Sequence, residues 1–209
     1  MLIPFRELFA RHSIEANGVV HLGANLGQEA DAYAALGISR VIWVEALPDV
    51  YRQLVKNVAR YPENIPLWAC LSDTDGDIVS FNVADNGGQS SSFLEFGTHR
   101  KAHPNVHFLK RIEMVTTRLD TLLKDNDVSL GTGWFLNVDV QGAELLVLRG
   151  MGDLLLCFDH AYIEVNTDIL YQGCPLVGEI DDYLRGFGFV GKETKMMRQG
   201  WGDKLYQRR

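Results

Sequence analysis

Two glycines stand in the segment HLGANLGQE, directly after a short β-rich run. Gly23 and Gly27 would let the backbone approach a ligand closely, and the amides that open the next helix would point at it. A tight strand-to-helix turn without a ligand would use the same glycines. The dinucleotide fingerprint GxGxxG would need glycine at positions 25 and 28, where Asn25 and Gln28 stand. The turn therefore does not predict a nicotinamide cofactor.

An acidic residue, Glu45, stands 22 positions beyond Gly23, at the end of the apolar run RVIWVE. A carboxylate at that place can accept hydrogen bonds from both hydroxyls of a ribose. An exposed glutamate at the end of a strand is the alternative, but apolar residues on both sides make it less attractive. Together, Gly23 and Glu45 predict a cofactor that contains adenosine.

Two later segments place polar side chains after strands. In LSDTDGD, Ser72 and Asp73 could reach an adenine edge, although the segment also has the composition of a hairpin turn. In WFLNVDVQGAE, Asp139 ends a strand, Gln141 lies in the turn, and Glu144 lies in the first helical turn. Asp139 could face the cofactor, whereas Glu144 could be structural, since a carboxylate suits the start of a helix.

Three histidines, His99, His103 and His107, recur every four residues, which on a helix would put them on one face. Pro104 interrupts the segment, and no carboxylate at a fixed spacing accompanies the histidines. We therefore expect a solvated loop and no metal site. The three cysteines are widely spaced without a CxxC pair, which argues against a zinc site or a disulfide framework.

Strand and helix patterns alternate along most of the chain. Apolar runs predict strands at 18–22, 40–45, 65–71, 77–83, 112–116, 134–139 and 160–165, and a strand pair in the tail. Helical spacing predicts helices at 28–36, 48–58, 119–124, 143–149 and 176–185. This alternation predicts an α/β fold with a mostly parallel sheet, in which ligands bind at the carboxyl ends of the strands.

The composition bounds the class of protein. The length of 209 residues predicts a single domain over 1–209, with an N-terminal helix within 1–17 and a loop or lid insertion at 85–111. The net charge of −7 argues against a nucleic-acid partner, although a local basic patch around Arg100 and Lys110 stays possible. No apolar run is long enough to span a membrane, and cysteine usage with no signal-like N-terminus favours the cytoplasm. The oligomeric state cannot be read.

In this order, HLGANLGQE, WVEALPDVYRQLVKNV, LSDTDGD, LDTLL and FLNVDVQGAELLVLRGM resemble the FkbM-type methyltransferases. AYIEVNTDILYQGCPL and IDDYLRGFGF are similar to the closing segment of that family. The resemblance runs from about residue 18 to about residue 190. It implies a Rossmann-like class I methyltransferase fold with a seven-stranded sheet and helices on both faces. It also implies the use of S-adenosylmethionine and O-methylation of hydroxyl groups, often on sugars or natural products.

The resemblance also implies roles for particular residues. Gly23, Asn25 and Gly27 would line the methionine part of the cofactor, Glu45 would hold the ribose, and Ser72 and Asp73 would lie near the adenine. His21, Asp139 and Gln141 complete the expected cofactor-binding set. His21 stands where many members carry Asp, Gln141 where Glu is frequent, and Arg118 interrupts the usual lead into LD.

A hydroxyl is a poor nucleophile at neutral pH, so a base should accept its proton. Asp139 and Glu164 are the preferred candidates, and His21 is a less favoured one. Each has a structural alternative, because Glu164 could only cap a strand and Asp139 could only orient the cofactor. Two other functions stay open: a cofactor-binding module that supports a partner without catalysis, and, less favoured, a nicotinamide-dependent oxidoreductase.

Overall fold

The computed structural model describes residues 2–209; Met1, which the expected domain and N-terminal segment include, lies outside the described residues. A main sheet is formed by β1 (Val19–Leu22), β2 (Val41–Glu45), β3 (Ile65–Trp68), β7 (Trp134–Val138), β8 (Phe158–Asn166), β9 (Phe189–Met196) and β10 (Trp201–Arg208). Its order is β3-β2-β1-β7-β8-β10-β9. The first five strands are mutually parallel, and β10 is antiparallel to both of its neighbours. The expected mostly parallel sheet is confirmed, with the correction that it is mixed.

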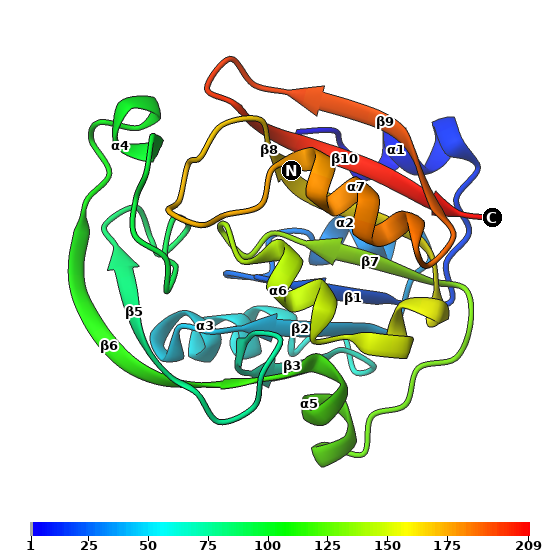
Figure 1. Cartoon of the computed structure of the whole chain (residues 1–209). Helices are drawn as coiled ribbons and strands as arrows, with labels where there is room; N and C mark the ends of the chain where they lie inside the picture. Colours follow the sequence, from blue (N-terminus) through cyan, green and yellow to red (C-terminus); the bar gives the residue numbers. More distant parts are fainter. Residues whose placement is uncertain (1) are drawn as a thin grey trace.

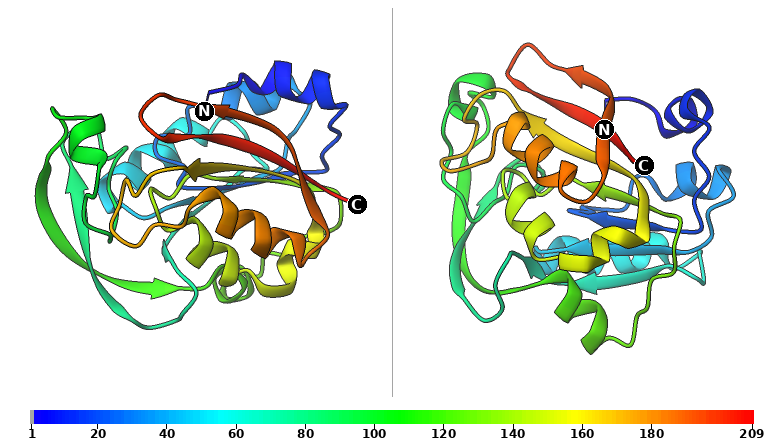
Figure 2. Two further views of the ribbon diagram at one scale, coloured as in Figure 1. Left: turned by 45° about the horizontal axis from the view of Figure 1, so that its top comes forward. Right: turned by 45° about the vertical axis from the view of Figure 1, so that its right-hand side comes forward.

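Helices cover both faces of this sheet (Figure 2). One face packs against α1 (Phe5–His12), α2 (Ala30–Ala35) and α3 (Pro48–Val58). The other packs against α5 (Leu119–Asp125), α6 (Glu144–Arg149), the 3-10 helix η1 (Gly152–Cys157) and α7 (Val177–Arg185). Successive strand residues point to opposite faces. Val19 therefore joins the first cluster, whereas Val20 joins the second.

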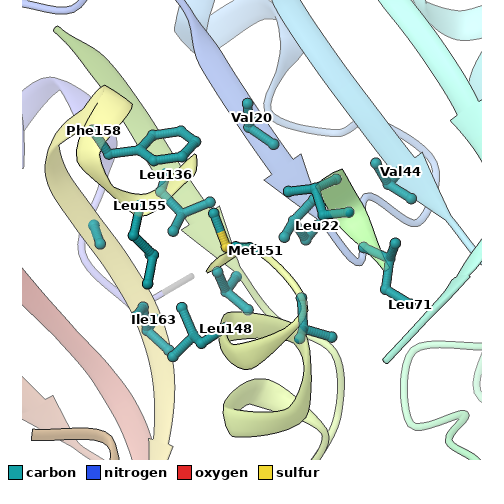
Figure 3. Close-up of a cluster of buried hydrophobic side chains, with 14 of the residues drawn as sticks. Val20, Leu22, Val44, Leu71, Leu136, Leu148, Met151, Leu155, Phe158 and Ile163 are labelled. Carbon is teal, nitrogen blue, oxygen red and sulfur yellow. The ribbon is translucent and has the colours of Figure 1, made fainter. Parts of the chain in front are cut away.

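The larger core cluster lies between the sheet and α6 with η1 (Figure 3). Leu148, Met151 and Leu155 are fully buried against strand residues such as Leu136 and Ile163. This packing fixes where β7 ends and α6 begins.

A second sheet has the order β4-β6-β5 and consists of β4 (Cys70–Leu71), β5 (Ile78–Ala84) and β6 (Phe108–Thr117). Two expectations are corrected here. The single strand expected at 65–71 divides at Ala69, because Cys70 leaves the main sheet and pairs with Thr116 of β6. The strand expected at 112–116 already begins at Phe108, where it pairs with β5.

We define residues 85–107, between β5 and β6, as the cap. It lies beyond the carboxyl ends of the parallel strands and contains the short helix α4 (His99–Ala102) (Figure 1). Backbone hydrogen bonds join it to the loop after β8: Gly97 N donates to Leu170 O at 2.7 Å and Thr98 N to Ile169 O at 2.8 Å. The expected surface loop is therefore an ordered element with fixed neighbours.

The remaining boundaries differ from the sequence expectations by a few residues. Helix α2 begins at Ala30 and not at residue 28, because residues 24–30 form consecutive turns in which Gly27 N donates to Ala24 O. The expected strand pair in the tail is present as β9 and β10. Within residues 2–209, no helix has the length and apolar character needed to cross a membrane.

Candidate active site

A cavity of about 430 Å³ opens where the carboxyl ends of the parallel strands meet the cap. Residues at the ends of β1, β2, β7, β8 and β10 form its floor, and cap residues cover it. Small-molecule sites are usually ~300–1,000 Å³. From β2 to β10 the floor crosses four strand spacings, or about 19 Å.

The glycine turn forms one part of the floor. Gly23 has φ +78°, and a Cβ there would lie 1.8 Å from the carbonyl oxygen of Asp139. Asn25 is also left-handed, with φ 45°, and lines the cavity with Gly23. Gly27 does not line it: a Cβ there would meet Leu54 of α3 at 2.8 Å. Gly23 therefore shapes the cavity, whereas Gly27 allows the turn to pack on a helix.

Glu45 is 7% exposed at the end of β2, and the backbone fixes its carboxylate. Asn25 N donates to Oε2 and Leu47 N donates to Oε1, both at 2.8 Å. Burial raises the pKa of Glu45, although these N–H groups favour the charged form. A carboxylate oxygen can accept more than one hydrogen bond, so Glu45, which lines the cavity, can also accept hydrogen bonds from a ligand.

Ser72 and Asp73 are not among the described residues that line the cavity. Ser72 N donates to Thr117 O, and Arg118 Nη1 donates to Asp73 O, so both residues belong to the join between β4 and α5. The neighbouring Ala69, Cys70 and Leu71 line the cavity in their place. The sequence reasoning missed them because an apolar strand gives no sign of where its end meets a ligand.

Asp139, after β7, and Glu164, on β8, form a carboxyl pair in the floor. The amide nitrogen of Gln141 donates to both, at 2.5 Å to Asp139 Oδ1 and 3.2 Å to Glu164 Oε2. Burial raises the pKa of both groups; the negative Asp139 raises that of Glu164 further, and the Gln141 amide opposes the rise for Asp139. The raised pKa values of both carboxyl groups favour a proton held within the pair over ionisation of both groups.

His21, on β1, is 3% exposed and occupies the wall behind this floor. Its ring stacks on Trp43 at 5.1 Å, Tyr33 Oη lies 3.2 Å from Nδ1, and Asn137 Nδ2 lies 3.1 Å from Nε2. Burial lowers the pKa of His21 to about 3, so the ring is neutral. Because protein groups enclose its ring, His21 has a structural role beneath the cavity floor.

Aromatic and hydroxyl groups line the end of the cavity under the cap. His99 stacks on Phe96 at 4.1 Å, and burial lowers the pKa of His99 to about 4. The ring centroids of His103 and Trp201 lie 6.4 Å apart, and the buried indole nitrogen of Trp201 has no hydrogen-bond partner among the described residues. His107 points elsewhere, to Asp85, and the described residues contain no group of three ligands suited to a metal ion.

The charge of the lining is one-sided. Among the described lining residues, five carry carboxyl groups and none is Lys or Arg: Glu29, Glu45, Asp139, Glu164 and Asp203. Such a cavity favours a positively charged ligand and disfavours a pyrophosphate.

Comparison with known proteins names the family. The model of the methyltransferase FkbM domain matches residues 21–190. The chain belongs to the FkbM methyltransferase family. It is also similar to the hexuronic acid methyltransferase AglP of Haloferax volcanii, with 29% identity over 149 residues, which are 71% of this chain and 55% of that protein. The chain thus spans just over half the length of this relative.

Solved structures agree with the fold of an FkbM methyltransferase. The magnesium protoporphyrin IX methyltransferase of Synechocystis PCC 6803, solved with bound S-adenosylmethionine, matches with a TM-score of 0.52 and 11% identity over 98% of this chain and 76% of that one. A TehB-like methyltransferase of Corynebacterium glutamicum matches with a TM-score of 0.50 and 9% identity over 99% and 89%. This FkbM-family chain therefore has the class I Rossmann-like fold of S-adenosylmethionine-dependent methyltransferases.

The cavity fits that cofactor. Glu45 offers fixed acceptors for ribose hydroxyls, Ala69 and Leu71 offer an apolar surface for a flat base, and the surrounding carboxyl groups suit the positive sulfur and amino group. The family decides between the two cofactor predictions in favour of S-adenosylmethionine over a nicotinamide. The structure brings His21, Gly23, Asn25, Glu45, Asp139, Gln141 and Glu164 to one cavity.

Proposed function

We propose that this FkbM methyltransferase methylates a hydroxyl oxygen of a sugar, a glycan or a related natural product. The name of the Haloferax relative, a hexuronic acid methyltransferase, supports a sugar acceptor. The end of the cavity under the cap supports it too, because the half-buried Trp201 supplies aromatic surface and Ser90 supplies a hydroxyl group to the lining. No Lys or Arg among the described lining residues is placed to hold a phosphate backbone, which favours a small acceptor over a nucleic acid.

The observation that carries the proposal is the carboxyl pair, Asp139 and Glu164, in the cavity floor. When bound, S-adenosylmethionine supplies a methyl group on a positive sulfur, which the acceptor oxygen takes as the carbon–sulfur bond breaks. Asp139 Oδ1 or Oδ2 accepts the proton that the hydroxyl loses, and the Gln141 amide stabilises the ionised carboxylate until then. A proton held within the pair limits the repulsion between its two carboxyl groups.

The remaining cavity residues orient the two ligands. Glu45 holds one end through hydrogen bonds, and the left-handed turn at Gly23 leaves the floor open beside Asp139. The cap excludes water from the reacting end, because it lies over the floor and is hydrogen-bonded to the loop after β8. Fixed positions of this kind contribute a large part of the barrier reduction in a two-ligand reaction.

An acceptor screen tests the function. The protein is incubated with S-adenosylmethionine and a panel of neutral sugars, sugar acids and polyhydroxylated natural products, and S-adenosylhomocysteine and methylated products are measured. We expect an O-methylated product, and kcat about 10²–10⁴-fold lower for Asp139→Asn, because a general base contributes this much. Asp182→Asn, on the exposed side of α7, serves as the matched control.

Two results would contradict the proposal. Methylation at nitrogen or carbon only would exclude O-methylation. A second contradicting result is that the wild type and Asp139→Asn bind the cofactor with equal affinity but neither transfers a methyl group to any acceptor. This result would support the alternative of a module that assists a partner without catalysis.

A further inference from the structure

Gln141 occupies an unusual position for its residue type. It follows the strand that carries Asp139, and its φ of 55° is left-handed, a conformation that residues other than glycine rarely adopt without a local reason. This backbone places the side-chain amide between two carboxyl groups that come from different strands.

The direction of the amide matters, because one end donates and the other accepts. Tyr171 Oη donates to Gln141 Oε1 at 2.7 Å, so the amide nitrogen faces Asp139 and Glu164. Tyr171 is 1% exposed. It packs against Gly142, where a Cβ would lie 2.9 Å from the Cβ of Tyr171, so this glycine makes room for the tyrosine.

Tyr171 also belongs to the contact between the cap and the loop after β8. Its ring pairs with Phe96 of the cap at 5.7 Å, and its hydroxyl lies 3.3 Å from Ser90 O. The chain of contacts therefore runs from the cap through one hydroxyl and one amide to the carboxyl pair.

We propose that Tyr171 and Gln141 are positioning residues that hold the Asp139–Glu164 pair ready to exchange a proton with the acceptor, and that they connect this pair to the cap. The inference rests on the proposed function, since it assigns the pair the acceptor's proton. Gln141 contacts the pair directly, and Tyr171 acts on the pair through Gln141.

The surroundings of the pair decide the direction of the expected change. The titratable groups that face it from the neighbouring elements are Glu144, Asp203, Glu45, Glu29, His21, His99, His103 and Tyr171. Four of these eight groups are carboxyl groups, whereas the Gln141 amide and the hydrogen bond with Glu164 lower the pKa of Asp139. If the amide loses its orientation, the pKa of Asp139 rises further, and the pair gives up its proton at a higher pH.

Binding of two ligands that differ in charge at the sulfur measures this proton without an acceptor. S-adenosylmethionine has a positive sulfur, and S-adenosylhomocysteine has a neutral one but is otherwise the same. Calorimetry between about pH 5 and about pH 9 gives the affinity for S-adenosylmethionine divided by the affinity for S-adenosylhomocysteine. This ratio should rise as the pair ionises, because a negative pair attracts the positive sulfur. Groups that both ligands share cancel in this ratio.

We expect Tyr171→Phe to shift the midpoint of this rise upward by about one pH unit, the size of a lost hydrogen bond to a charged group. Tyr206→Phe is the matched control: Tyr206 is also 1% exposed and its hydroxyl donates to a carboxylate, Asp181, outside the cavity. Its midpoint should equal that of the wild type. Gln141→Asn, which keeps a residue tolerant of left-handed backbone but shortens the amide, should shift the midpoint in the same direction.

Three outcomes would overturn the proposal: no pH dependence of the ratio in the wild type, equal loss of affinity for both ligands at every pH in Tyr171→Phe, or a shift in Tyr206→Phe of the same size. If Tyr171→Phe does not fold, the midpoint measured for Gln141→Asn tests the proposal by itself. Because the measurement uses no acceptor, an upward shift together with a negative acceptor screen would reject the proposed function and keep the positioning roles.

Discussion

At the scale of single residues, the carboxylate of Glu45 is oriented by the backbone before any ligand binds. The N–H groups of Asn25 and Leu47 each hold one of its oxygens, and the residue lines the cavity. Its distance along the chain from Gly23 made it predictable, because both residues follow parallel strands that end at the same edge. Tyr171 could not be given its role in this way, since its partners Gln141 and Ser90 come from loops far apart in the sequence.

Replacing Glu45 by Gln should weaken S-adenosylhomocysteine binding about 10- to 100-fold, because hydrogen bonds to a charged group contribute roughly 1.5–3 kcal/mol. The new amide group would also set a donor against the N–H of Asn25 or Leu47. Calorimetry measures the affinity, and circular dichroism checks the fold. Glu63→Gln, an exposed residue that accepts a hydrogen bond from Ser39, is the control. If the two variants bind S-adenosylhomocysteine with equal affinity, Glu45 does not hold the ribose.

At the scale of elements, the main sheet followed from the alternation of apolar runs and helical patterns, but the second sheet did not. Residues 65–71 are one apolar run in the sequence, and the chain changes sheets within it because β6 pairs with Cys70 from outside. The cap was expected as a loop because its composition is polar and rich in glycine. Its order comes from partners about 70 residues away along the chain, at Ile169 and Leu170.

The cap should separate from the loop after β8 in Gly97→Ala. A Cβ at this position would lie 2.2 Å from Ile169 O, which disrupts the hydrogen bonds from the amides at positions 97 to 99. Hydrogen exchange at these amides should accelerate by at least about tenfold, since each bond contributes roughly 0.5–1.5 kcal/mol. Gly178→Ala, on α7 with open space around its Cβ, is the control. Unchanged exchange would show that the cap is held by its aromatic contacts instead.

At the scale of the whole molecule, the fold buries carboxyl groups together at one edge of the sheet. Glu144 is 0% exposed, and burial raises its pKa to about 7 from 4.5. Its Oε1 accepts from the N–H groups of Val140 and Gly142, so the carboxyl group also fixes the turn that carries Gln141. The sequence predicted a structural role as one of two options for Glu144, but a pattern of residues does not show how deeply a carboxyl group is buried.

The stability of the protein should therefore depend on the charge of Glu144. Because the folded pKa lies above the unfolded one, the folded state binds this proton more tightly, and its stabilising effect is complete below about pH 4.5. It is lost as pH rises to about 7, at a cost on the order of 3 kcal/mol. Glu144→Gln does not titrate, so its unfolding free energy relative to the wild type should increase over this range. Urea unfolding measures it, with the exposed Glu15→Gln as control; a constant difference would contradict the expectation.

The carboxyl groups that line the cavity also affect how charged ligands enter and leave it. A methyl donor with a positive sulfur is attracted by these carboxyl groups while it diffuses toward the opening, over a range of about 10 Å at 0.1 M salt. The proposed methyl transfer removes that charge, so the demethylated product would leave against a weaker attraction than the one that brought the donor in. The ionised carboxyl groups of the lining therefore favour exchange of product for donor, and rising ionic strength reduces this advantage.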